Sequence, residues 1–247
     1  MTAATYPLYR ASGPPRELGR QHGEQAAEQI RGLVDYLARS LQLSRDSLRE
    51  RALRFQRLFE MVCPHLLEEI RGLAEGAGLP PADALVVQLR GELGQAPEEA
   101  CTAFAVDGTR TATGEPLIGQ TSDTPPEFME FGYVLHLAPV NRPELLMWTF
   151  GGMIGYHGIN RHGVGHFANA LGGGPEWSFA LSHYPLKRMI LEQRSLDEVV
   201  KLMRRVRVCS NGNYVLCDRS VGVLDVELTS DGLELHEQPP DGGCVHD

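Results

Sequence analysis

The chain is 247 residues long, which is enough for one large domain or two small ones. Its 42% hydrophobic and 22% charged residues are typical of globular proteins and exclude collagen, coiled coils and wholly disordered chains. The 23 basic and 32 acidic residues give a net charge of −9, which argues against a nucleic acid or an anionic membrane as partner.

The first hundred residues favour helices. Apolar residues recur at helical spacing over residues 26–41, and a second apolar run follows. Pro64 is expected to kink or restart this second run, and Gly76 and Gly78 are expected to end it. A short third helix, opened by a Pro-Pro pair, is expected to end near Leu93.

The pattern changes to strands at Cys101. Residues 101–106 and 115–120 are expected to form a hairpin around an Asp-Gly turn. Other segments are expected to be strands (132–138, 145–150, 153–160, 164–170, 212–217, 221–228 and 232–237) or helices (177–192 and 195–205). Helices, then strands, then two helices and strands again predict an α+β fold built in layers.

No apolar stretch reaches the length of a membrane span, and residues 1–7 lack the basic start and apolar run of a secretory signal. We therefore expect a cytoplasmic protein with no membrane partner. Five cysteines without a C-x-x-C pair fit neither a disulfide framework nor a zinc knuckle.

Cys101 differs from the other cysteines in its surroundings. It follows a polar segment, residues 96–100, and it is the first residue of a predicted strand. A cut before Cys101 would place a free α-amine and a thiol on one residue. The amine, with a reference pKa of about 7.7 to 8.0, could take the proton of a thiol whose reference pKa is about 8.5.

Short motifs along nearly the whole chain give it a resemblance to a known family. They are Gly19-Arg-Gln-His22-Gly23, Glu68-Glu-Ile-Arg-Gly-Leu-Ala-Glu-Gly-Ala77, Gln88-Leu-Arg90-Gly-Glu92, Cys101-Thr-Ala-Phe, Gly119-Gln120, Asp123, Gly158-Ile-Asn160, Gly163-Val164, Asn169-Ala-Leu171 and Cys244-Val-His246. In their order and spacing the chain resembles the penicillin acyltransferase family of self-processing N-terminal-nucleophile hydrolases, which includes isopenicillin-N acyltransferase.

The resemblance implies a four-layer αββα sandwich made as a precursor. Cleavage between Ala100 and Cys101 would give a helical α-chain, residues 1–100, and a β-chain, residues 101–247, which associate in one structural domain. Cys101 would then attack an amide or thioester carbonyl of a small acylated substrate, with an acyl-CoA donor as one option and no cofactor. By analogy, Asp123 orients or polarises the Cys101 amine and thiol.

The chain departs from the family pattern at three places. Ala100 stands where the family has Gly before the nucleophile, and Thr121 replaces an Asn. The chain stops at Asp247, where the family continues into an Asn proposed to donate to the oxyanion and further strands with an active-site Arg. We therefore expect the sheet to lack its C-terminal strands and a further segment or subunit to complete it.

The other candidate residues have weaker support. Thr121, Phe150 and Asn169 are predicted to bind substrate, although packing and turns explain such residues as readily. Arg90 and Glu92 are predicted to tie the helix before the cleavage point to the rest of the fold.

Three histidines within ten residues, His157, His162 and His166, raise the question of a metal site. The glycine-rich segment around them does not support converging rings, so we predict no metal.

Two functions remain open from the sequence. The first is an acyl-transferring or amide-hydrolysing enzyme with Cys101 as its N-terminal nucleophile. The second is a catalytically silent family member that stays as one chain and serves as a binding or scaffold subunit. The retained Cys101 and Asp123 favour the enzyme, whereas the missing Asn and Arg favour the scaffold.

Overall fold

The computed structural model describes residues 5–94, 100–172, 177–219, 222–236 and 243–246, with the backbone alone for Ala100 and residues 243–246. The chain divides into two compact units, Met1–Ala96 with Pro125–Tyr156 and Pro97–Thr124 with His157–Asp247. Both units combine helices with strands, which confirms the predicted α+β class. The division at residue 100 concerns a cleavage and stays a prediction.

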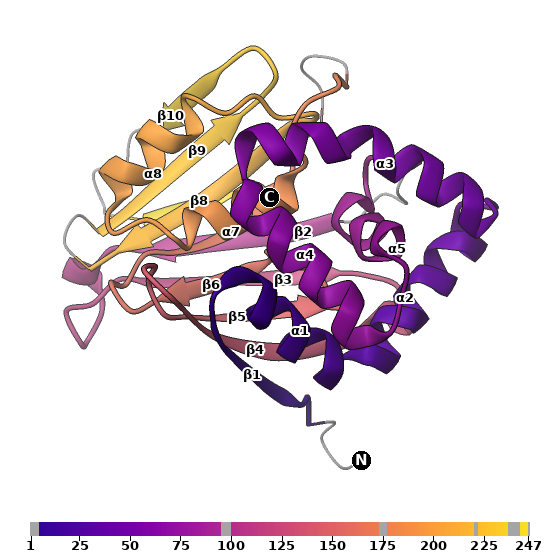
Figure 1. The fold of residues 1–247 in the computed structure, drawn as a ribbon. Coiled ribbons are helices and arrows are strands. Elements are labelled where there is room, and N and C mark those ends of the chain that lie inside the picture. The colour runs from indigo at the N-terminus through magenta and orange to yellow at the C-terminus, as the bar shows by residue number, and fades with distance from the viewer. Residues whose placement is uncertain (1–4, 95–99, 173–176, 220–221, 237–242, 247) are drawn as a thin grey trace. The chain divides into compact units, whose positions relative to one another are not determined.

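The first unit carries most of the helices (Figure 1). Its elements are β1 (Leu8–Gly13), α1 (Pro15–Gln25), α2 (Ala27–Ser40), α3 (Arg45–Val62), α4 (Pro64–Ala77), α5 (Pro81–Val86), the 3-10 helix η1 (Val87–Leu89), α6 (Pro126–Met129), β4 (Gly132–Pro139) and β5 (Leu145–Phe150). Strand β4 pairs in parallel with β1 and antiparallel with β5. No described helix has the length and apolar character that crossing a bilayer requires.

Proline and glycine set the ends of α4 as predicted, with one exception. Pro64 is its first residue, and Gly78 caps its end in the left-handed conformation, at φ 63°. Gly76 lies inside the helix, so the prediction that it ends α4 is wrong. The reason is packing: a Cβ on Gly76 would lie 2.0 Å from the carbonyl oxygen of Arg20 in α1.

Other glycines of α1 and α4 also lie against the backbone of the facing helix. A Cβ on Gly19 of α1 would lie 1.8 Å from the Glu69 carbonyl oxygen, and one on Gly72 of α4 would lie 1.9 Å from that of Arg16. Glycines four residues apart on both helices therefore let the two backbones touch. Two of the motifs that carry the family resemblance, residues 19–23 and 68–77, therefore contain the glycines that let these helices pack closely.

The segment before β6 is not the strand that the sequence predicts. Gln88 donates from Nε2 to the Gly152 carbonyl oxygen at 2.9 Å and accepts at Oε1 from the Ile154 N–H at 3.0 Å. These bonds hold the segment as a loop, with φ 86° at Gly152. The predicted strand 153–160 therefore begins only at His157.

The second unit contains most of the strands. Its elements are β2 (Ala100–Val106), the 3-10 helix η2 (Gly108–Arg110), β3 (Leu117–Asp123), β6 (His157–Asn160), β7 (Gly165–Ala170), α7 (His183–Ile190), α8 (Leu196–Met203), β8 (Gly212–Asp218), β9 (Gly222–Leu228), β10 (Leu233–His236) and β11 (Gly243–His246). Within this unit β6-β7-β8-β9-β10 form a larger antiparallel sheet and β11-β2-β3 a smaller one. The predicted hairpin is thus confirmed, and the predicted helix 177–192 begins only at His183.

The two sheets of this unit stack face to face. Ala103 and Ala105 of β2 share an apolar core with Val215 and Cys217 of β8. Helices α7 and α8 cover the other face of the larger sheet, at β7 and β8 respectively, and all seven residues of β8 are buried between the layers. The second unit is therefore an αββ arrangement, three of the four layers that the resemblance implies.

Candidate active site

Cys101 is the second residue of β2 and lies opposite Ser122 of β3, with its Sγ 3.8 Å from Ser122 Oγ. Its side chain is partly buried, whereas Cys63, Cys209 and Cys217 are buried. Burial raises the pKa of the Cys217 thiol to about 11, which makes it unreactive near neutral pH. Among the cysteines whose side chains the structure describes, only Cys101 is open to a reactant from solvent.

The Cys101 side chain leaves β2 on the face that packs against the larger sheet. Side chains alternate along a strand, so Cys101 shares this face with Ala103 and Ala105. Those alanines are 0% and 1% exposed in the inter-sheet core. The thiol therefore lies at the end of a packed layer between two sheets, where the apolar core stops.

Gln120 ties the hairpin to β7 beside this point. It lies two residues before Ser122, on the same face as Ser122 and Cys101 by alternation. Its Nε2 donates to the Ala168 carbonyl oxygen at 2.9 Å and to Asn169 Oδ1 at 2.7 Å. The second bond fixes the orientation of the Asn169 amide, whose side chain is buried.

A second polar pair extends the site across the larger sheet. Asn213 of β8 lies opposite Asn169 of β7, and its Nδ2 donates to Asp225 Oδ1 of β9 at 2.6 Å. All three side chains are buried. We call Cys101, Ser122, Gln120, Asn169, Asn213 and Asp225 the polar end of the inter-sheet layer.

Beyond this polar end, the described core of the layer consists of Ala103, Ala105, Val215, Cys217 and Val223, with Ile118 and Phe167 packed against it. Burying polar groups costs free energy that apolar side chains would not cost. Clusters of buried polar groups around one accessible nucleophile are typical of functional sites. The polar end is therefore the candidate active site.

The structure does not bring Asp123 against the thiol in the intact chain. Asp123 is the last residue of β3 and lies opposite Ala100, one position beyond the partner of Cys101. By alternation, its exposed carboxylate and the exposed side chain of Thr121 leave the opposite face of the hairpin. The roles of Asp123 toward the new amine and of Thr121 toward a substrate stay predictions.

Arg90, Glu92 and Phe150 belong to the first unit. Arg90 Cζ lies 4.4 Å from the centre of the Phe128 ring, which supports its predicted structural role. Glu92, two residues after Arg90, is partly buried. Phe150 is 2% exposed and packs against Phe128 and Trp148. Its predicted contact with substrate, like the structural role of Glu92, stays a prediction.

A lysine and two histidines form a second buried polar cluster, between α7 and β7. Lys187, 8% exposed, places its Nζ 3.2 Å from Nε2 of His157, and the Ala168 N–H donates to the same nitrogen. Nε2 of His157 is therefore an acceptor, and the ring carries its proton on Nδ1. His166 donates from Nε2 to the Lys187 carbonyl oxygen at 3.1 Å.

These rings are neutral at pH 7. Burial first, and then the Lys187 ammonium, lower the pKa of His157 well below its usual value. The same two causes lower the pKa of His166 to about 3 and that of His183 to about 4. His183 accepts from the Tyr214 hydroxyl at Nδ1 and donates from Nε2 to a carbonyl oxygen.

The three histidines singled out by the sequence do not meet. His157 and His166 have ring centres 5.8 Å apart at an interplanar angle of 89°, whereas His162 is exposed. Within the described residues, no three His, Cys, Asp or Glu side chains are grouped so as to hold a metal ion.

The sequence reasoning assigned no role to Gln120, Asn213, Asp225 or Lys187. One signal for Asn213 was available: it shares a strand face with Val215 and Cys217, where a core position calls for an apolar residue. The contacts of Lys187 and Gln120 reach across 30 and 49 residues and leave no local pattern.

Comparisons with known proteins place the chain in a family. A family model described as acyl-coenzyme A:6-aminopenicillanic acid acyl-transferase matches residues 109–245, a stretch that begins after Cys101. The solved structure of penicillin V acylase from Agrobacterium tumefaciens is similar at 12% identity and a TM-score of 0.33, over 55% of this chain and 41% of that one. No curated protein matches. Because the family model covers more than half of the residues, the chain belongs to the acyl-coenzyme A:6-aminopenicillanic acid acyl-transferase family.

Proposed function

We propose that this chain is a self-processing N-terminal-nucleophile enzyme with Cys101 as its nucleophile. It transfers or hydrolyses the acyl group of a small substrate held as an amide or a thioester. The description of the family names an acyl-CoA donor and an amine acceptor, 6-aminopenicillanic acid. We extend to this chain the chemical class alone: an activated acyl group passed to an amine or to water.

Activation starts in the intact chain. Cys101 Sγ adds to the carbonyl carbon of Ala100, the peptide C–N bond breaks, and the acyl group moves from nitrogen to sulfur. Water then hydrolyses the thioester. The products are residues 1–100 with a new carboxylate and residues 101–247 with a free α-amine on Cys101, and the two chains stay associated.

Turnover uses the new amine as base. With reference pKa values of about 7.7 to 8.0 and 8.5, the amine can accept the thiol proton near neutral pH. The thiolate adds to the substrate carbonyl, and the leaving amine or thiol takes up that proton as its bond to carbon breaks. Water or an acceptor amine then attacks the thioester formed on Cys101 and regenerates the thiol.

One observation carries this proposal: the only solvent-accessible cysteine among the described side chains is the second residue of β2, at the polar end of the inter-sheet layer. Among the described atoms there, the buried Asn213 Oδ1 has no hydrogen-bond partner in the protein, so it is available to accept from a substrate N–H. An inert structural thiol would instead be enclosed by apolar groups, as Cys217 is.

Intact-mass spectrometry of the purified protein tests the proposal. We expect two species, residues 1–100 and 101–247, in place of one of 27.2 kDa. Cys101→Ala removes the nucleophile and should leave a single chain, whereas Cys209→Ala, which changes a buried cysteine, should still split. Splitting of Cys101→Ala at the same bond, or an intact wild-type chain that is inert toward thioester and amide substrates, would contradict it.

The alternative, a catalytically silent binding subunit, has one structural observation in its favour. The Asp123 carboxylate and the Cys101 thiol lie on opposite faces of the hairpin in the intact chain. Under this alternative the wild-type protein and the Cys101→Ala variant both stay as one chain, and both bind a partner equally well.

A further inference from the structure

Strand β1 is an edge strand of its sheet, and its outer edge is where an extra strand could add. The Val134 N–H donates to the Pro7 carbonyl oxygen at 2.9 Å, and the Val140 N–H to that of Gly13 at 3.1 Å. Odd-numbered residues of β1 therefore turn their backbone groups toward β4. The backbone N–H and C=O groups of Arg10 and Ser12 point away from β4, toward the open edge.

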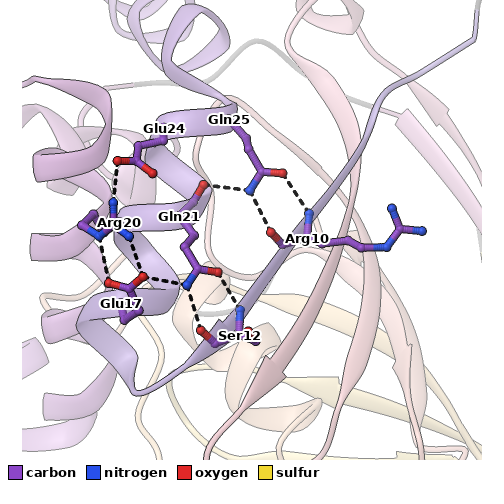
Figure 2. A network of polar contacts seen from close by, with 7 residues as sticks. All are labelled: Arg10, Ser12, Glu17, Arg20, Gln21, Glu24 and Gln25. Carbon is purple, nitrogen blue, oxygen red and sulfur yellow. Dashed lines mark hydrogen bonds and ion pairs between the residues drawn. The ribbon is translucent and has the colours of Figure 1, made fainter.

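Two glutamines of α1 occupy this edge. Gln25 accepts from the Arg10 N–H at 3.2 Å and donates to the Arg10 carbonyl oxygen at 2.8 Å. Gln21 does the same with Ser12, at 3.0 and 3.1 Å (Figure 2). A carboxamide has the donor and acceptor of a peptide group, so each side chain takes the place of one residue of a neighbouring strand.

The spacing of the two glutamines matches the strand. Four residues of an α-helix rise about 6.0 Å. Two residues of a β-strand rise about 6.6 Å. Glutamines at i and i+4 can therefore each reach an outward-facing residue of β1 without strain in either element.

The remaining amide hydrogens fix both side chains. Gln21 Nε2 also donates to Glu17 Oε1 at 2.7 Å, and Gln25 Nε2 also donates to the Gln21 carbonyl oxygen at 2.8 Å. Arg20 forms two bonds to Glu17, at 2.8 and 2.6 Å. Hydrogen bonds from Arg20 and Gln21 lower the pKa of Glu17 to about 2, so this acceptor stays ionised at neutral pH.

We propose that the side chains of Gln21 and Gln25 take the place of a neighbouring strand at the edge of β1. They thereby prevent β1 from pairing with β1 of a second copy of this chain. An unpaired edge is a template for strand pairing, and natural proteins protect such edges. Two identical edges related by a two-fold axis can pair with each other, antiparallel, in a closed dimer. The two glutamines satisfy the outward backbone groups of Arg10 and Ser12, which such a dimer would use, so the edge is closed at these two residues in the native chain.

The double variant Gln21→Ala/Gln25→Ala tests this inference. In light scattering coupled to size exclusion, its mass should double, relative to the wild type, as its concentration rises. Hydrogen exchange at the Arg10 and Ser12 amides should become about two- to tenfold faster at low concentration, the equivalent of one lost hydrogen bond, and slow again in the dimer. The control Glu28→Ala changes an exposed residue three positions after Gln25 and should behave as the wild type.

A third substitution provides the rescue. Adding Ser12→Pro to the double variant removes an outward donor without affecting the bonds to β4, so it should restore the wild-type mass. A double variant of wild-type mass at every concentration, with unchanged exchange at both amides, would overturn the inference. So would association that persists with Ser12→Pro or that gives aggregates without a defined dimer.

Discussion

Acidification from pH 7 to 4.5 is expected to destabilise the protein steeply, because unfolding frees three neutral histidines, two of them buried and one partly buried, to take up protons. The groups are His157, His166 and His183. His157 and His166 have polar contacts with Lys187, and the charge of Lys187 also acts on His183. Where a histidine is protonated in the unfolded chain and neutral in the folded protein, the free energy of unfolding falls by about 1.4 kcal/mol for each pH unit of acidification. Three such histidines together lower it by about 4 kcal/mol per unit. This is a large fraction of a typical stability of about 5–15 kcal/mol.

The direction follows from the pKa values. In the unfolded chain a histidine titrates at about 6.5. In the folded protein His166 titrates at about 3 and His183 at about 4. Between these values the unfolded state binds more protons, so the stabilisation is complete above pH 6.5 and is lost as the pH falls toward 4.

Urea unfolding at half-unit steps from pH 7.5 to 4.5 measures this effect. His183→Gln removes one titrating group and should reduce the slope of unfolding free energy against pH by about 1.4 kcal/mol per unit. The exposed His162 provides the control, since His162→Gln should leave the slope as it is. A midpoint that stays constant down to pH 5 would show that these rings do not titrate in this way.

The sequence predicted most of the fold because most of its signals are local. Helical spacing, Pro64 and Gly78 fix the helices of the first unit, and the turn after residue 106 fixes the hairpin that carries Cys101. Strand β1 escaped prediction because only one of its six residues, Ala11, is buried, so its pattern does not alternate. Helix α6 escaped because it has four residues.

The site could be predicted only in part. Cys101 stands out locally, because it follows a polar segment of the sequence and begins a predicted strand. The polar end depends on register: Gln120 meets Asn169, and Asn213 meets Asp225, only after β3, β7, β8 and β9 are in place. Pairings of this kind involve residues far apart in the chain, and no periodicity encodes them.

Gly72→Ala is expected to destabilise the protein by about 3 kcal/mol or more, at the upper end of what overpacking costs. The new Cβ would lie 1.9 Å from the Arg16 carbonyl oxygen and 2.9 Å from the Arg20 backbone nitrogen. Backbone atoms cannot turn aside as a side chain does, so α1 and α4 would have to separate. The higher helix propensity of alanine offsets only about 1 kcal/mol of this cost.

A glycine in open space separates steric cost from the general effect of the substitution. Gly91 has no atom within 4 Å of where a Cβ would stand, so Gly91→Ala should change the unfolding free energy by less than about 0.5 kcal/mol. In Gly19→Ala the new Cβ would lie against the Glu69 carbonyl oxygen of the facing helix. This substitution should lower the free energy of unfolding by as much as Gly72→Ala does. Because either substitution alone forces the same separation, the double variant should lose less than the sum of the two. Equal urea midpoints for Gly72→Ala and Gly91→Ala would mean that α1 and α4 do not touch through their backbones.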